Sequence, residues 1–173
     1  MPNWCMNQLD IYGQKIELAR FISVAEGSEI LDENDDKTLL CFDNFAPMPK
    51  ELINTISPPE RHNRNLTRKF GADNWYDWRV RNWGTKWPAS GVELCSTKVF
   101  HMTSEKPIEI IYDFETAWSP PEPIVMKMSK MFPKLKFKLK YWEAGMGFRG
   151  IFIAKNGKII KNRTYNYMGD RGG

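Results

Sequence analysis

The sequence contains two histidines, and one of them stands in a pattern associated with catalysis. His101-x-Thr103 is one half of the paired His-x-Thr signature of two-histidine phosphoesterases. The other half is missing, because His62 is followed by Asn63 and Arg64. A small hydrolase of nucleotides or phosphodiesters near His101 is therefore one hypothesis for this chain.

Carboxylates and thiols give weaker signals. Asp113 and Glu115 lie two residues apart on one expected strand, so they point the same way and could share general acid–base work, although such pairs are common on exposed strands. Cys5, Cys41 and Cys95 have no CxxC spacing and no basic neighbour, which favours buried structural thiols over a nucleophile, a disulfide or a zinc site. We expect no catalytic residue, no metal and no cofactor, and an enzyme is the less favoured class.

Tryptophan and arginine concentrate between residues 65 and 87, which hold four of the seven tryptophans. Planar cations mixed with aromatic rings can stack nucleic-acid bases or anchor a protein interface. The alternative is a tryptophan core with an Asp77–Arg81 pair on a helix. Trp118, farther along the chain, can pack on the same region. The binding residues expected here are Trp78, Arg79, Arg81, Trp83, Lys86, Trp87 and Trp118.

A lysine-rich strand forms a second candidate surface. Its lysines, with Arg149 on the neighbouring hairpin, could follow a phosphate backbone, as on the open sheet face of RNA-recognition modules. The aromatic strand signature of those modules is absent. The alternative is a solvated face whose lysines pair with acidic neighbours such as Asp10, Glu109 or Asp113. The residues of this candidate surface are Lys136, Lys138, Lys140 and Arg149.

The helices and strands that position these residues are predicted from hydrophobic periodicity and from the turn and capping residues that bound each segment. Alternating patterns predict strands at 4–12, 92–102, 108–115 and 135–142, and a hairpin of 148–154 with 158–163 around Asn156-Gly157. A helical period predicts one helix over 15–26. Ser119-Pro120-Pro121-Glu122 has the form of a capping box that starts another helix, which Pro133 stops. The resulting order predicts an α+β fold, a ferredoxin-like βαββαβ antiparallel sheet with helices on one face.

Length and composition fit one domain, since 42% of the 173 residues are hydrophobic. We expect a single ferredoxin-like domain over 1–173, with a Trp-rich helical insertion at about 33–90, an extra C-terminal β-hairpin and a loose tail over 164–173. The acidic loop 28–37 lacks the spacing of an EF-hand and is expected to be solvated. The second face of the sheet stays bare unless the insertion or a partner covers it.

The formal net charge of +4 permits a nucleic-acid or acidic-protein partner without demanding one. The N-terminal residues do not follow the pattern of a signal peptide, and no apolar run reaches the ~18 residues that a membrane helix needs. We therefore expect a cytoplasmic protein with no membrane association. The oligomeric state stays open.

Five segments in this order resemble the phage and plasmid YubB-like family. They are NWCMNQL at 3–9, FAPMPKEL at 45–52, YDWRVRNWGTKW at 76–87, YDFETAWSPPEP at 112–123 and EAGMGFRG at 143–150. The resemblance implies a ferredoxin-like domain and a home on mobile genetic elements, and it implies no catalytic residues. The expected function is a non-enzymatic binding protein that acts on a host or defence protein. Single-stranded nucleic-acid binding through the lysine-rich face and hydrolysis are the alternatives.

Overall fold

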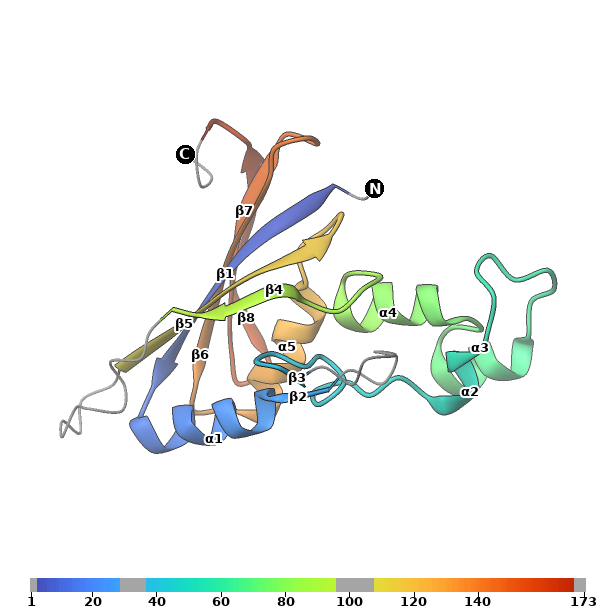
Figure 1. Cartoon of the computed structure of the whole chain (residues 1–173), viewed down its shortest axis with the longest axis horizontal. Coiled ribbons are helices and arrows are strands. Elements are labelled where there is room, and N and C mark those ends of the chain that lie inside the picture. The colour runs from blue at the N-terminus through green and yellow to red at the C-terminus, as the bar shows by residue number, and fades with distance from the viewer. Residues whose placement is uncertain (1–2, 29–36, 96–107, 170–173) are drawn as a thin grey trace.

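The computed structural model describes residues 3–28, 37–95 and 108–169 (Figure 1). Its main element is a six-stranded antiparallel sheet of order β4-β5-β1-β6-β7-β8. The strands are β1 (Trp4–Gly13), β4 (Ser90–Leu94), β5 (Ile108–Ala117), β6 (Lys136–Glu143), β7 (Phe148–Lys155) and β8 (Lys158–Asn166). Two short strands, β2 (Gly27–Ser28) and β3 (Lys37–Thr38), pair separately.

Five helices accompany the sheet within the described ranges. They are α1 (Lys15–Ala25), α2 (Lys50–Ile53), α3 (Arg64–Phe70), α4 (Trp75–Trp83) and α5 (Glu122–Met131). Helix α1 follows β1, and α5 connects β5 to β6, so four strands in the order β4-β5-β1-β6 have the ferredoxin-like βαββαβ arrangement. The β7–β8 hairpin extends the sheet beyond β6. The predicted fold class is confirmed.

The core lies between α1, α5 and one face of the sheet. On β6 the apolar residues alternate with lysines, and Phe137, Leu139 and Tyr141 are buried on the helix side. Phe21 of α1 lies at the centre of this core, with its ring centroid 5.2 Å from that of Phe132. Each such side chain contributes about 1.5–3 kcal/mol on burial. The alternation that predicted β6 therefore also fixes which face of the sheet meets the helices.

The insertion packs beside α5 and leaves the second face of the sheet uncovered by any described helix. The amino group of Lys127 on α5 donates to Asn82 Oδ1 on α4 at 2.6 Å. Ser119 Oγ donates to the Gly84 carbonyl at 2.6 Å, which ties the end of α4 to the start of α5. In Figure 1, α2, α3 and α4 extend away from the sheet on the helix side.

Two local predictions are wrong. The capping box at Ser119 does not form, because the Ser119 hydroxyl binds Gly84 and α5 begins only at Glu122, with Pro121 at its N-cap position. The tail expected from residue 164 is shorter, because β8 pairs with β7 up to Asn166. The second half of the strand expected over 92–102 lies outside the described residues. Within the described ranges no helix is long and apolar enough to span a membrane.

Candidate binding site on the insertion

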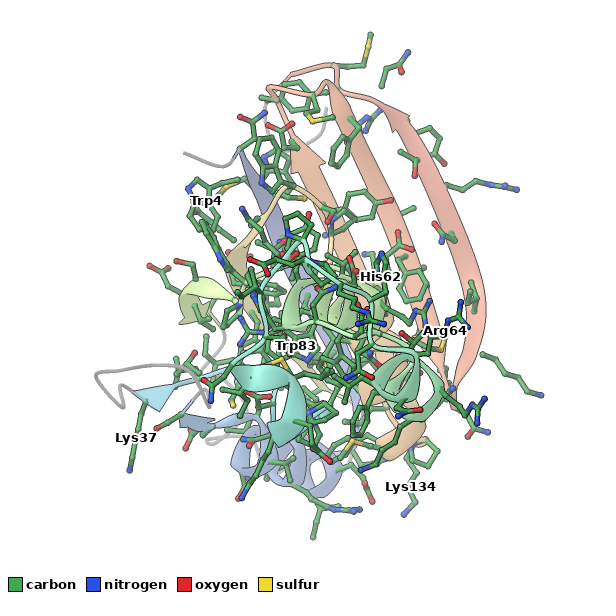
Figure 2. The ribbon with its side chains drawn as sticks, turned by 90° about the vertical axis from the view of Figure 1, so that its right-hand side faces the viewer. Trp4, Lys37, His62, Arg64, Trp83 and Lys134 are labelled. Atoms are coloured by element: carbon green, nitrogen blue, oxygen red, sulfur yellow. The ribbon has the colours of Figure 1, made fainter. Side chains whose placement is uncertain are left out.

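The tryptophans of the insertion divide into a buried and an exposed set. Trp83 is fully buried, and its Nε1 donates to the Ala46 carbonyl at 2.9 Å. Figure 2 shows it in the interior of the molecule. Trp78 and Arg79 are also buried, and the Arg79 guanidinium lies 4.6 Å from the centre of the Trp83 ring. The expectation that Trp78, Arg79 and Trp83 present a binding surface does not fit this burial, since they belong to the core.

The expected helix pair between Asp77 and Arg81 is absent. The Arg81 guanidinium instead donates to the Gly71 carbonyl at the end of α3. Asp77 accepts from the side-chain amide of Asn74, the residue that caps α4. Arg81 thus fixes the α3–α4 turn, where Gly71 has a φ of 80° that favours glycine.

The exposed aromatic side chains line a hollow of about 750 Å³. Trp87 and Tyr76 are each 37% exposed there, and Lys86 Nζ lies 4.2 Å from the centre of the Trp87 ring. This aromatic hollow, as we call it, is lined by Trp75, Tyr76, Trp87, Pro58, Pro59, Ser57, Asp77, Lys86 and His62. Flat rings beside a lysine ammonium can hold a planar ligand group that carries negative charge nearby.

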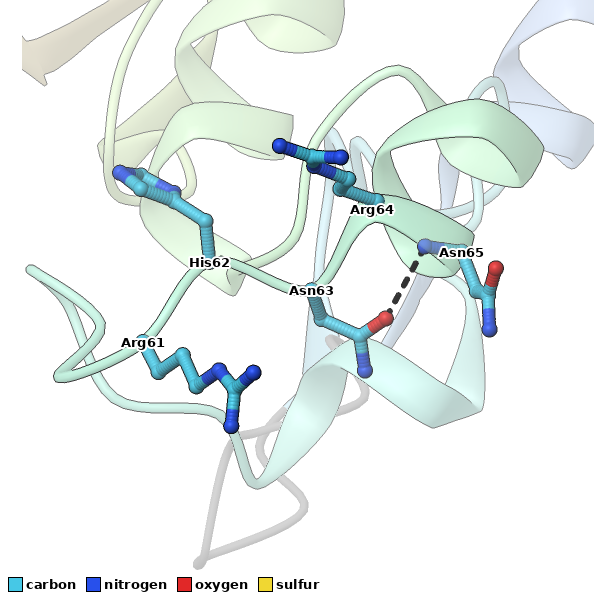
Figure 3. Close-up of a pocket in the computed structure, with 5 residues that line it drawn as sticks. All are labelled: Arg61, His62, Asn63, Arg64 and Asn65. Atoms are coloured by element: carbon cyan, nitrogen blue, oxygen red, sulfur yellow. Dashed lines mark hydrogen bonds between the residues drawn. The ribbon is translucent and has the colours of Figure 1, made fainter.

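A second hollow, of about 720 Å³, lies in the segment that leads into α3 (Figure 3). This cationic hollow is lined by Arg61, His62, Asn63, Arg64 and Asn65. Within the part of the chain that the structure describes, neither Arg61 nor Arg64 has a carboxylate partner. Arginine forks of this kind bind phosphate oxygens in pairs.

His62 belongs to both hollows, and a buried carboxylate fixes its orientation. Its Nδ1 lies 2.8 Å from Asp73 Oδ2, which also accepts from the Asn63 backbone N–H at 3.0 Å. The hydrogen bond from His62 is the main reason why the pKa of Asp73 is lowered from its usual value. The ionised carboxylate can only accept, so Nδ1 carries the proton in this pair. The His62 side chain is 80% exposed, and its Nε2 is available to a ligand.

Asparagine caps fix where the two helices beside these hollows begin. Asn63 caps α3 by accepting from the N–H groups of Asn65 and Leu66, and Asn74 caps α4 by accepting from Asp77. The two asparagines occupy the N-cap positions of α3 and α4, and a single turn connects these two helices. Figure 2 shows His62 and Arg64 close together on the insertion.

Sequence reasoning missed Arg61, His62, Arg64 and Asp73, and it found the aromatic hollow only through Lys86 and Trp87. No motif joins residues 62 and 73. The two asparagines, which favour helix N-caps, were the one available signal that the segments flanking them turn sharply.

The lysine-rich strand is partly neutralised. Lys138 Nζ and Lys140 Nζ lie 3.3 and 3.2 Å from the same oxygen of Asp10, which is 1% exposed. Lys136 lies over the Tyr12 ring, and Arg149 lies over the Tyr165 ring. The acidic neighbour expected for these lysines is therefore present for two of them.

Trp118 differs from the buried tryptophans, because it is 43% exposed and its φ is 71°. A bulky residue rarely occupies this left-handed region. The backbone N–H of Trp118 donates to the Asn3 carbonyl, and Thr85 Oγ1 donates to the Ala117 carbonyl, both at 3.0 Å. These bonds from neighbouring segments hold the backbone in place while the ring faces solvent.

The remaining sequence candidates are dispersed. His101 lies outside the described residues, so the hydrolase hypothesis at that position has no structural description. Cys5 and Cys41 are buried, and burial chiefly raises the pKa of the Cys5 thiol to about 12. Cys95 is exposed, contrary to expectation, and its Sγ lies 3.2 Å from Asp113. No group of described side chains is arranged to hold a metal ion.

Comparison with known proteins places the fold. Residues 100–167 match the model of a family described as the ferredoxin-like domain in Api92-like protein. The structure is similar to the crystal structure of a protein Api92 from Yersinia pseudotuberculosis, with a TM-score of 0.60 and 11% identity over 98% of this chain and 100% of that chain. No curated protein matches the sequence. In sequence over residues 100–167 and in fold over nearly its whole length, the chain is therefore similar to Api92-like proteins.

Proposed function

We propose that this protein is a non-enzymatic binding protein, and that its insertion binds single-stranded nucleic acid. The observation that carries the proposal is that one residue, His62, lines both the aromatic hollow and the cationic hollow. Each nucleotide of a single strand has a flat base and a charged phosphate, so the base can occupy the aromatic hollow while a phosphate occupies the cationic hollow.

Each hollow matches one part of a nucleotide. Trp87 and Tyr76 supply exposed rings on which a base can stack, and such stacking contributes about 1–3 kcal/mol per base. Arg61 and Arg64 supply the cations for the phosphate, and His62, whose side chain is 80% exposed, lines both hollows. Because every base has a flat face, we expect little sequence preference.

The insertion is a better candidate than the lysine-rich strand. Asp10 already compensates Lys138 and Lys140, so fewer counterions would be released when a phosphate backbone binds there. Arg61 and Arg64 have no such carboxylate within the described residues. This contrast favours the insertion over the sheet face as the phosphate-binding surface.

The resemblance to the YubB-like family supports an origin on a phage or plasmid, with action in the host cytoplasm. It also supports a second candidate function, binding of a host or defence protein. The observation in favour is Trp118, an exposed ring on a backbone held at positive φ. Strained positions of this kind cluster at binding sites, and tryptophan is common among the residues that dominate protein interfaces.

Fluorescence anisotropy of a labelled single-stranded oligonucleotide tests the first candidate. We expect Trp87→Ala to weaken binding about 5- to 150-fold, the equivalent of one lost stack. Arg61→Ala with Arg64→Ala should weaken it as well. The matched control is Lys37→Ala with Lys50→Ala, two exposed cations that line neither hollow, and it should have little effect.

Three results would contradict this assignment. Binding that is equally sensitive to the Lys37 and Lys50 control would indicate nonspecific attraction to positive charge. Absence of binding even at low salt would leave the protein-partner candidate, which a pull-down with Trp118→Ala then tests. Cleavage of the oligonucleotide that His62→Ala abolishes would show an enzyme.

A further inference from the structure

The uncovered face of the sheet is divided by charge. The register places cross-strand partners on the same face, so β4 and β5 contribute one set of side chains and β7 and β8 another. The acidic half consists of Glu93, Glu109, Asp113 and Glu115. The basic half consists of Arg149, Lys155, Lys161 and Arg163. Between them, on β1 and β6, Asp10 is paired with Lys138 and Lys140.

Both halves contain like charges that stand directly opposite each other. Glu93 is the register partner of Asp113, and Lys155 of β7 is that of Lys158 of β8. Like-charged cross-strand pairs destabilise a sheet. An opposing surface of opposite charge would relieve this repulsion in each half.

Apolar side chains lie among these charges and do not belong to the core. Ile111, Ile151, Ile153 and Trp142 are partly exposed on this face, although their neighbours on the helix side are buried. None of the described helices covers them. The face therefore mixes apolar side chains with charged ones in each half, and non-obligate protein interfaces are about as mixed in polarity as this.

We propose that this sheet face binds a second copy of the same chain. The two sheets would be related by a two-fold axis that lies between them and runs parallel to the strands. Such an axis reverses the strand order, so β5 faces β7 of the second copy, β4 faces β8 and β1 faces β6. Glu115 then faces Arg149 of the second copy, and Glu93 faces Arg163 of the second copy. The acidic half of each chain meets the basic half of the other.

The charge pattern selects this axis over the other simple choice. An axis perpendicular to the strands keeps the strand order, so β5 would face β5 and acid would meet acid. Electrostatic complementarity disfavours that arrangement. A two-fold interface also closes on itself, so it makes a dimer and no larger array.

The area of the face is comparable with that of a dimer interface. Six strands spaced about 4.8 Å apart, each contributing about eight residues, cover on the order of 700 Å² per copy. A standard stable interface buries about 800 Å² per partner. Aligned packing of two sheets about 10 Å apart accommodates side chains of this length.

Charge reversal tests the proposal with sedimentation equilibrium as the readout. Wild type is expected to dimerise in the micromolar range, and more weakly as salt rises. The acidic-half variant, Glu93→Lys with Glu115→Lys, and the basic-half variant, Arg149→Glu with Arg163→Glu, should each be monomeric. Their equimolar mixture should form a heterodimer, because each reversed half meets the reversed half of the other chain. Lys50→Glu, on α2 away from the face, should dimerise like wild type.

Circular dichroism of each variant separates lost dimerisation from lost folding. A wild type that stays monomeric throughout the range, or a mixture that stays monomeric while both variants are folded, would overturn the proposal. So would variants that dimerise as well as wild type. A monomeric wild type whose oligonucleotide binding disappears in the basic-half variant would assign the face to nucleic acid. That last outcome would also contradict the proposed nucleic-acid site on the insertion. The other outcomes leave that site untouched, because none of its residues is changed.

Discussion

His62 and Asp73 are joined by a 2.8 Å hydrogen bond between Nδ1 and Oδ2, although they lie eleven positions apart in the chain. The bond connects the segment before α3 to the start of α4. It also fixes the imidazole where two hollows meet. The candidate site therefore depends on a contact between two turns of the insertion.

The first prediction concerns the acid sensitivity of this contact. The pKa of Asp73 is lowered in the folded protein, mainly by the hydrogen bond from His62. A lowered carboxyl pKa stabilises the fold above the unfolded-state value of 3.8, and that stabilisation is lost as the pH falls through the folded-state value. Asp73→Asn should therefore be less stable than wild type near neutral pH, and the difference should shrink below pH 3.8. Urea unfolding across a pH series measures it, and a difference independent of pH would contradict the assignment.

The second prediction separates core from surface tryptophans. Trp83→Ala removes a fully buried ring and its bond to Ala46, so it should lower the free energy of unfolding by about 3–5 kcal/mol. Trp87→Ala removes a ring that is 37% exposed and lies beside Trp4, so it should cost less than Trp83→Ala, about 1–2 kcal/mol. Chemical unfolding of both variants provides the comparison. Equal losses would show that Trp87 is structural and weaken the proposed site.

The third prediction concerns the backbone at Trp118. Because its φ of 71° suits glycine, Trp118→Gly should be more stable than Trp118→Ala by about 1 kcal/mol. Ile16, exposed on α1, is the matched control, and there glycine should be less stable than alanine by about 1 kcal/mol. Thermal unfolding measures both pairs. The same order of stability at both positions would contradict the strained conformation of Trp118.

The fourth prediction concerns the approach of β7 to β6. A Cβ at Gly150 would overlap the ring of Tyr141, its register partner, whose hydroxyl lies 3.0 Å from Thr164 Oγ1. Gly150→Ala should therefore destabilise the protein by about 1–3 kcal/mol. In combination with Tyr141→Leu the cost of Gly150→Ala should fall, because the smaller side chain leaves room for the methyl group. A double-mutant cycle measures this coupling, and additive effects would contradict the contact.

The fold followed from periodicity more directly than the site did. An alternating pattern such as Phe137, Leu139 and Tyr141 arises whenever one face of a strand is buried. The apolar stripe that includes Phe21 arises whenever one side of a helix packs on a sheet. Both patterns can be recognised without knowing which other elements the strand or the helix packs against. The prediction of a capping box was wrong because the Ser119 hydroxyl donates to the carbonyl of Gly84, which is distant in sequence.

Burial in the insertion could not be deduced from residue type. Trp83 and Trp87 lie four residues apart and look equivalent in sequence, but the first is buried against Ala46 and the second is 37% exposed beside the ring of Trp4. Which tryptophan is buried depends on where residues 45–48 pack against α4, a tertiary contact that no local pattern encodes. The pairing of His62 with Asp73 depends in the same way on the turn at Gly71.

The salt dependence of oligonucleotide affinity tests the central claim most directly. For single strands the logarithm of the binding constant falls with the logarithm of salt by about 0.7 per phosphate contact. Removal of Arg61 and Arg64 together should therefore flatten the slope by about 1.4, whereas Trp87→Ala should lower affinity and leave the slope unchanged. A slope that is unchanged in the double arginine variant, or flattened instead by Lys138→Ala with Lys140→Ala, would show that the insertion is not the phosphate site.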